Sequence, residues 1–437
     1  MSTITMKKSI QFLFLLFVFL LPVQTQFIYQ ETIINAEKYQ FETQAIFGTE
    51  LLLGLIVLLT IISFFQNFKK REKKFTADEK TNLGIFAALL SICAANCFFA
   101  DNSSLAFYKF TQLILGATVA IIAVTSQVGI KKICVALAAS GVVQAIFAVW
   151  QFATQSVFNC KWLGMAAQDP AILGTSVIEQ NSERLLRAYG TMPHPNLLAG
   201  FLTICLLATL FLITKLKGGR RIIAIIGFAI IFLGLLLTFS RAGLIAFFAG
   251  FAIWIIFTLK NRLPAKPLLI SFAISIVLSI VFGVATFDFT KTRIIGGRLE
   301  QISTEQRLSE FQESTTILNN DWLTGSGLGN YTLSLKNQFP DKHAWEYQPP
   351  HNAFWLFIIE FGVIQGAIIL LTLFGFIFWA IKSTPESLEK YFSMALATAW
   401  LILAGLDHYF ISFWTGIIIF GLIMGIILNN RIGKRSK

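Results

Sequence analysis

Charged residues are scarce in this chain of 437 residues, where they make up 13% of the sequence. Soluble domains carry about 25%. Hydrophobic residues make up 55% and aromatic residues 14%, and the mean hydropathy is +0.70. This composition excludes an ordinary soluble globular protein. Because many of the apolar runs approach about 20 residues, the sequence predicts a polytopic membrane protein.

Cysteine is also scarce, with five residues in the whole chain. Cys93, Cys97, Cys134 and Cys205 fall inside apolar runs, and only Cys160 lies in a polar stretch. This distribution excludes a disulfide framework and a thiolate metal site. The sequence also lacks a repeated helical-hairpin unit and the paired interrupted spans that are typical of inverted-repeat transporters.

Twelve apolar segments are long enough, or nearly so, to cross about 30 Å of hydrocarbon as helices. They cover residues 9–27, 45–66, 82–100, 110–128, 133–153, 195–214, 222–239, 242–259, 268–286, 353–381, 391–406 and 409–429. We therefore predict an all-α polytopic membrane protein with about twelve transmembrane helices, in one membrane domain over residues 1–437. We expect the first segment to be retained as a helix rather than cleaved as a signal peptide. Segment 353–381 could begin as a short interfacial helix.

Most of the 35 lysines and arginines fall on one side of these segments, in short clusters such as Lys69-Lys70-Arg71 and Lys131-Lys132. This is the positive-inside pattern, and it predicts that both termini are cytoplasmic. It also explains the net charge of +12 without a nucleic-acid partner. Two long loops then face outward, over about residues 154–194 and 287–352. We expect the second to be a large, partly helical extracytoplasmic loop between spans nine and ten.

All four histidines fall on the predicted outer side: His194, His343, His351 and His408. His351 is the most informative, because it follows Pro349-Pro350 at the junction between the polar loop and an apolar helix. A histidine at that boundary exchanges protons near neutral pH. It would therefore meet a membrane-tethered substrate at the height of the head group.

Arg241 lies between two apolar segments that are joined by almost no loop, 222–239 and 242–259. A positive charge held so close to hydrocarbon is costly unless it is paired or used. Arginines at helix ends often serve as snorkelling anchors. Here the charge also opposes the orientation signal, which favours a functional role for Arg241.

The stretch from Arg187 to Asn196 leads into the sixth apolar segment through Gly190, Pro193 and Pro195, which enforce a turn. Arg187 or His194 could contact a phosphate there, and Asn196 lies at the start of the helix, where amides can bind an anion. The alternative is a helix entry with a snorkelling arginine. The residues alone leave both interpretations open.

Within the larger loop, residues 306–318 have the pattern of an amphipathic helix. Its expected apolar face consists of Leu308, Phe311, Thr315 and Leu318. Arg307 and Glu310 are three residues apart, so spacing alone favours an exposed salt bridge between them.

The following segment, Leu323-Thr-Gly-Ser-Gly-Leu-Gly-Asn330, is a G-x-G-x-G stretch without the β-α-β context of a dinucleotide site. We expect a tight turn that lets the backbone approach a ligand.

Together these groups suit transfer from a lipid-linked diphosphate. Arginines bind phosphate oxygens through paired hydrogen bonds, and a histidine can accept the proton of an attacking hydroxyl. No Asp-rich metal cluster appears in these segments, so the arginines could replace a divalent cation, and we expect no cofactor. A transporter is the less favoured alternative, because it should place charges deep in several spans.

In their order along the chain, four pieces resemble the superfamily of O-antigen ligases and O-antigen polymerases. The likeness covers about residues 80–430. The pieces are Arg187–Asn196, Thr238-Phe-Ser-Arg241-Ala-Gly243, Arg307 with the turn ending at Asn330, and His351-Asn352.

The resemblance implies a metal-independent, inverting glycosyltransferase of the bacterial inner membrane that uses an undecaprenyl-diphosphate-linked glycan. His351 would be the catalytic base, and Arg241, Arg307 and, less securely, Arg187 would bind the diphosphate. His194, Asn196 and Asn352 could support them. The acceptor stays open between lipid A–core, another lipid-linked glycan and a protein.

Overall fold

The protein is described by a computed structural model over residues 3–68, 77–181 and 183–432. The basic cluster at residues 69–74 and the basic C-terminal residues 434–437 lie outside the described residues. The described chain is mostly helical, with two short β-hairpins.

Ten of the twelve predicted apolar segments each coincide with one helix, and segments 353–381 and 409–429 each cover a short helix followed by a long one. Eight helices are long and apolar enough to cross a membrane within the described ranges: α2, α4 to α9 and α14. The total of twelve spans remains a prediction. The long helices are α1 (Thr3–Leu20), α2 (Gly48–Phe68), α3 (Ala77–Phe99), α4 (Ser103–Thr125), α5 (Ile130–Thr154), α6 (Pro195–Lys215), α7 (Gly219–Leu237), α8 (Arg241–Lys260), α9 (Lys266–Ala285), α14 (Val363–Lys382), α15 (Leu388–Leu406) and α17 (Trp414–Ile432).

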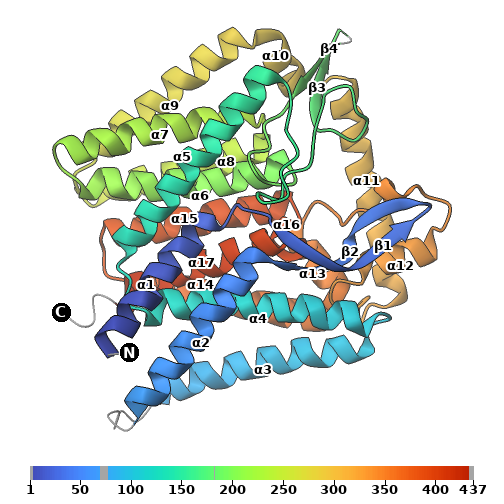
Figure 1. Cartoon of the computed structure of the whole chain (residues 1–437), viewed down its shortest axis with the longest axis horizontal. Coiled ribbons are helices and arrows are strands. Elements are labelled where there is room, and N and C mark those ends of the chain that lie inside the picture. Colours follow the sequence, from blue (N-terminus) through green and yellow to red (C-terminus); the bar gives the residue numbers. More distant parts are fainter. Residues whose placement is uncertain (1–2, 69–76, 182, 433–437) are drawn as a thin grey trace.

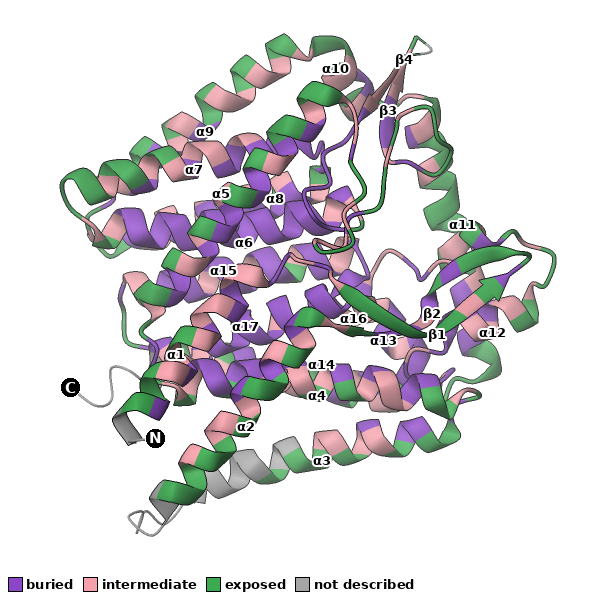
Figure 2. Cartoon of the chain, in the orientation of Figure 1, coloured by how far each residue is buried: buried purple, intermediate pink, exposed green. Residues whose placement is uncertain are grey.

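Helix α6 is the centre of the bundle. It is buried along almost its whole length and packs against α5, α7, α8 and α15 (Figure 2). Small residues allow this packing: a Cβ added at Gly243 of α8 would lie 2.8 Å from the Ala199 Cβ of α6. Membrane helices commonly associate through close contact at small residues. Lipid tails are as apolar as the side chains, so the hydrophobic effect adds little to helix association and close packing must supply it. Helix α6 is therefore a central packing element, and the residues at its N-terminal end are held by that packing.

Helix α1 begins and helix α17 ends at the same end of the bundle (Figure 1). The hairpin β1–β2 and the helices α11 and α12 gather at the opposite end. This arrangement separates the termini from the elements that carry most polar groups. The cytoplasmic position of the termini stays a prediction.

Two β-hairpins were not predicted from the sequence. Strands β1 (Gln26–Ile34) and β2 (Glu37–Phe47) pair antiparallel through a turn in which Asn35 and Ala36 have positive φ angles of 50° and 65°. Strands β3 (Val177–Gln180) and β4 (Glu183–Leu186) form the second hairpin. Because residues 26–47 are strand, helix α1 stops at Leu20 and helix α2 starts at Gly48, so the predicted segments 9–27 and 45–66 were too long at these ends.

The predicted segment 353–381 is broken at Gly362 into the short helix α13 (Ala353–Phe361) and helix α14. Gly362 has a φ of 77°, and a Cβ there would lie 2.3 Å from the Leu323 carbonyl oxygen. The backbone amides of Ser326 and Gly327 donate to the carbonyls of Ile359 and Glu360, both at 3.0 Å. The G-x-G-x-G turn does permit a close backbone approach, and its partner here is α13, whereas its approach to a ligand stays a prediction.

Residues 287–352 contain α10 (Phe287–Ile295), α11 (Arg298–Asn320), α12 (Tyr331–Gln338) and the 3₁₀ helix η1 (Ala344–Glu346). The helix expected at 306–318 is the second half of α11. Its buried face is formed by Ser314, Ile317 and Leu318, whereas Leu308 is 60% exposed and Phe311 is 53% exposed. The predicted apolar face was therefore partly wrong, because α11 packs on α12 and α13 mainly through its C-terminal half. The remaining short helix, α16 (Tyr409–Ser412), precedes α17.

Candidate active site

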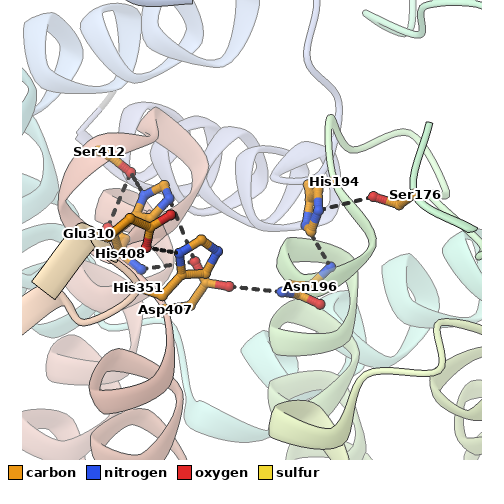
Figure 3. A network of polar contacts seen from close by, with 8 residues as sticks. All are labelled: Ser176, His194, Asn196, Glu310, His351, Asp407, His408 and Ser412. Atoms are coloured by element: carbon orange, nitrogen blue, oxygen red, sulfur yellow. Dashed lines mark hydrogen bonds and ion pairs between the residues drawn. The ribbon is translucent and has the colours of Figure 1, made fainter. Parts of the chain in front are cut away.

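Polar helix ends from distant parts of the chain meet at one place (Figure 3). Helix α6 begins directly after His194, α13 begins directly after Asn352, and α15 ends directly before Asp407. Helix α11 supplies Glu310 from the side. The site is therefore assembled by the tertiary packing of helix ends rather than by one contiguous motif.

His351 is held in place by the start of α13. The Asn352 side chain accepts a hydrogen bond from the Trp355 amide at 3.0 Å and so caps this helix. The Trp355 indole donates to the Ser314 hydroxyl of α11 at 2.9 Å. Asn352 thus supports His351 through the backbone, and Trp355 fixes α11 beside it.

The imidazole of His351 pairs with a carboxylate of α11. Its Nδ1 lies 2.9 Å from Oε2 of Glu310, and both side chains are partly buried. Because a carboxylate only accepts hydrogen bonds, Nδ1 carries the proton and Nε2 is the basic nitrogen. The expected Arg307–Glu310 salt bridge does not occur among the described ion pairs, because the Glu310 carboxylate is directed to His351 instead.

The surroundings of His351 raise its pKa. Burial alone would lower the pKa of the imidazole, but its hydrogen bond to Glu310 and the negative charges of Asp407 and Glu310 more than offset it. Arg307 acts in the opposite direction. The result is an imidazole more basic than usual, as a group that accepts a hydroxyl proton requires.

Asp407 and His408 form the second part of the site, and the sequence interpretation gave them no role. Both are buried, and the Asp407 carboxylate accepts from the Asn196 side-chain amide at 3.0 Å and from the His408 backbone amide at 2.8 Å. Burial opposes ionisation of Asp407, but His408, His351 and His194 nevertheless hold its pKa below the usual value. The sequence did offer a signal for Asp407, because its carboxylate directly follows an apolar helix. A charge so close to hydrocarbon is costly unless it is paired or used, and the same argument favoured a functional role for Arg241.

The rings of His408 and His351 meet edge to face, with centroids 5.4 Å apart. His408 Nδ1 lies 2.6 Å from the Ser412 hydroxyl. Burial lowers the pKa of His408 to about 4, although Asp407 raises it. His408 is therefore a neutral side chain that packs against His351.

His194 is the N-cap of helix α6. Its Nδ1 accepts a hydrogen bond from the backbone amide of Asn196 at 3.1 Å, and its Nε2 lies 3.1 Å from the Ser176 hydroxyl. Burial, followed by the positive charge of Arg187, lowers the pKa of His194 to about 3. With both nitrogens engaged, His194 is a structural group in this geometry.

Arg187 is 6% exposed and binds protein groups. Its Nε donates to the Thr238 carbonyl at 2.8 Å, and its terminal nitrogen donates to the Asn196 side-chain oxygen at 2.7 Å. The side-chain amide nitrogen of Asn196 in turn donates to the Asp407 carboxylate. Arg187 is thus linked to Asp407 through Asn196.

Arg241 and Arg307 are placed differently, because both are exposed. Arg241 is the first residue of α8, after a turn in which Phe239 has a φ of 49° and the Ser240 side chain caps the helix. Arg307 lies on α11, one helical turn before Glu310. Neither guanidinium has an ion-pair partner within the described part of the chain.

Arg293 is a third arginine of this group and was not singled out from the sequence. It is 18% exposed, pairs with Glu300 at 2.9 Å and donates to the Phe239 carbonyl at 3.1 Å. Burial lowers its pKa, and the positive charges of Arg241 and Arg307 contribute to the lowering. Arg293 therefore lies within electrostatic reach of both exposed arginines.

A pocket of about 160 Å³ lies beside His351. It is bordered by α11 on one side and by the segment around η1 on the other. The lining side chains are polar except for one tryptophan: Ser303, Gln306, Ser309, Glu310, Glu313, Lys342, Trp345, Glu346, Gln348 and His351. In the described residues, no group of three or more His, Cys, Asp or Glu side chains could hold a metal ion. Metal independence stays a prediction.

Residues 226–371 match the family model described as O-antigen ligase. The matched segment includes Arg241, Arg293, Arg307, Glu310 and His351, whereas the network around Arg187, His194 and Asp407 lies outside it. No curated protein matches the chain.

Proposed function

Since the match supports a member of the O-antigen ligase superfamily, we propose that this membrane glycosyltransferase moves a glycan from an undecaprenyl-diphosphate-linked donor to an acceptor hydroxyl. The reaction would take place at the outer face of the bacterial inner membrane. The observation that carries the proposal is the His351–Glu310 pair at 2.9 Å. It borders a polar pocket and lies on the side of the molecule that carries the exposed Arg307.

In the proposed reaction, Nε2 of His351 takes the proton of the acceptor hydroxyl. The hydroxyl oxygen forms a bond to the anomeric carbon of the donor, and the bond from that carbon to the diphosphate oxygen breaks. The electron pair leaves with the diphosphate, and attack from the opposite face inverts the anomeric centre. Glu310 holds the imidazole in the reactive tautomer and stabilises the imidazolium that forms.

Arg241 and Arg307 would bind the diphosphate, because both guanidiniums are exposed and have no acidic partner among the described residues. Preorganised positive charge stabilises the charge that develops on a leaving group, so the arginines would serve in place of a metal ion. Arg187, which is buried and donates to Thr238 and Asn196, would position Asn196 and Asp407 rather than contact the glycan donor.

The acceptor decides which member of the superfamily this is. We propose the ligase type, with lipid A–core as acceptor. A polymerase would use another lipid-linked repeat unit, and a protein ligase would use a protein hydroxyl. All three need the same base and the same diphosphate site.

The test uses the purified protein in liposomes with a polyprenyl-diphosphate glycan and three competing acceptors: lipid A–core, a second lipid-linked repeat and a protein. The expected result is a new glycosidic bond with release of polyprenyl diphosphate, formed by the wild type and not by His351→Ala. The acceptor that is consumed identifies the type.

Movement of the donor across the bilayer without a new glycosidic bond would instead show a transporter. Equal transfer by the wild type and His351→Ala would remove the proposed mechanism.

A further inference from the structure

The pocket beside His351 has the composition of a carbohydrate site. Its lining consists of carboxylates, amides, hydroxyls, one lysine and the imidazole of His351, with Trp345 as the one large aromatic side chain. A polar space of about 160 Å³ has room for several water molecules. It is therefore open to a polar ring that replaces them.

Trp345 can supply the stacking surface that a sugar ring needs. It belongs to the short helix η1, and its side chain is 54% exposed. The indole stacks on the ring of His343, with centroids 5.6 Å apart and an interplanar angle of 7°. The C–H face of a pyranose packs on an aromatic face, and a ring that is already stacked loses little freedom when it binds.

Amide groups in the pocket can satisfy the hydroxyls of the same ring. Gln348 uses its amide nitrogen to donate to the Trp345 carbonyl at 2.8 Å, which leaves its side-chain oxygen as an acceptor. Gln306 has no hydrogen-bond partner recorded in the described residues, so both of its polar atoms remain for a ligand. Sugar hydroxyls donate and accept, and amides match both functions.

The charges in the pocket indicate which sugars it would take. Glu310, Glu313 and Glu346 contribute three carboxylates, against the ammonium of Lys342 and the imidazole of His351. Lys342 is already paired with Glu313. A further anion would meet unpaired negative charge, so the pocket disfavours diphosphates and acidic sugars.

The position of the pocket separates acceptor from donor. Its lining includes His351 but neither Arg241 nor Arg307. A ring bound there contacts the base and not the groups proposed to hold the diphosphate. On this basis, and resting on the proposed function, we propose that the pocket binds the terminal sugar of the acceptor, and that this sugar is a neutral or amine-bearing pyranose.

The kinetic test compares two tryptophans of equal exposure. Trp345→Ala removes the stacking surface, whereas Trp322→Ala removes an indole that is also 54% exposed but does not line the pocket. For Trp345→Ala we expect the KM for the acceptor to rise about tenfold, with the KM for the donor unchanged. Trp322→Ala should alter neither constant. An unchanged acceptor KM in Trp345→Ala, or a raised donor KM, would overturn the assignment.

A binding measurement works without transfer. Saturation-transfer NMR on the purified protein in nanodiscs, with a free hexose, a hexosamine and a uronic acid as probes, should show contacts for the first two and not for the third. Trp345→Ala should lose these contacts, and Trp322→Ala should keep them. Equal binding of the uronic acid, or equal binding by Trp345→Ala, would contradict the proposal. If the wild type binds hexose but transfers nothing to any acceptor, the proposed function fails while the pocket assignment stands.

Discussion

Two histidines of this protein, His194 and His351, have similar local sequences and opposite chemistry. Each stands beside a proline, each lies within two residues of the start of a helix, and each is partly exposed. The pKa of His194 is lowered to about 3, and the pKa of His351 is raised. Burial lowers the pKa of both and Asp407 raises the pKa of both, so the difference comes from their other charged neighbours, Arg187 beside His194 and Glu310 beside His351.

The hydrogen bonds of the two rings complete the contrast. Both nitrogens of His194 are used, one by the Asn196 amide and one by the Ser176 hydroxyl. In His351 the Glu310 carboxylate uses only Nδ1, and Nε2 has no partner recorded in the described residues. The position of a histidine at a helix start therefore does not make it a base. A histidine can act as a base when a carboxylate binds one ring nitrogen and the other ring nitrogen is free.

The largest expected effect separates these two histidines. His351→Ala should lower the rate of glycan transfer by about 10²–10⁴-fold, the range that a positioned general base contributes. His194→Ala should transfer at a rate within a few-fold of the wild type per folded molecule, because it removes a helix cap. The measurement is transfer in liposomes at matched protein content. Equal losses in the two variants would break the comparison.

Two arginines should differ in the same way as the two histidines, with a smaller loss of transfer rate. Arg241→Lys should reduce transfer about 10²-fold, because lysine keeps the charge but lacks the planar fork that binds two phosphate oxygens. Arg187→Lys should mainly lower stability, by about 1–3 kcal/mol, through lost hydrogen bonds to Thr238 and Asn196. Transfer rate and thermal stability are measured for both variants. If the Arg187→Lys protein kept normal stability but lost glycan transfer, Arg187 would instead contact the glycan donor.

A smaller effect is expected in the dependence of stability on pH. His194 and His408 have depressed folded pKa values, so below about pH 6.5 the unfolded chain binds protons that the folded chain does not. Their contribution is fully present above that pH and is lost as the pH falls toward 4. The midpoint of thermal unfolding should drop by a few degrees between about pH 7 and pH 5.

The variant His194→Asn should reduce this drop, because the asparagine does not titrate. His351, with its raised pKa, acts in the opposite direction, since its contribution is present below about pH 6.5 and is lost as the pH rises through its folded value. An identical pH dependence in His194→Asn and the wild type would contradict a neutral, depressed His194.

The smallest expected effect is that of a chelator. If Arg241 and Arg307 neutralise the leaving diphosphate, EDTA should leave the transfer rate unchanged within error. Transfer that is lost with EDTA and restored by a divalent cation would assign that neutralisation to a metal.

Much of the scaffold was predictable because hydropathy is a local property. The twelve apolar segments coincide with helices, and the absence of a loop beside Arg241 follows from the sequence alone. The hairpin at residues 26–47 was missed because its strands lie among flanking helices and carry mixed polar side chains. The turn at Gly325 and Gly327 was visible, but its partner α13 was not, because that contact depends on packing.

The site was predictable only in part for the same reason. His351 stands out at a boundary, but Glu310 lies 41 residues away, and local spacing assigned it to Arg307. Asp407 and His408 come from another helix end, and Arg293 approaches Arg241 only in the folded chain. Pairwise contacts across the fold are not encoded in local spacing, so the partners that set the pKa of His351 could not be read in advance.

The proposed mechanism requires that His351 is a base whose pKa is raised by Glu310, and the pH dependence of the transfer rate tests this directly. The rate should rise with pH through a single midpoint above about 6.5, because only the neutral imidazole accepts a proton. In Glu310→Gln the midpoint should move to lower pH and the plateau should fall. A flat wild-type profile would contradict His351 as the base, and a midpoint that does not move in Glu310→Gln would contradict Glu310 as the group that raises its pKa.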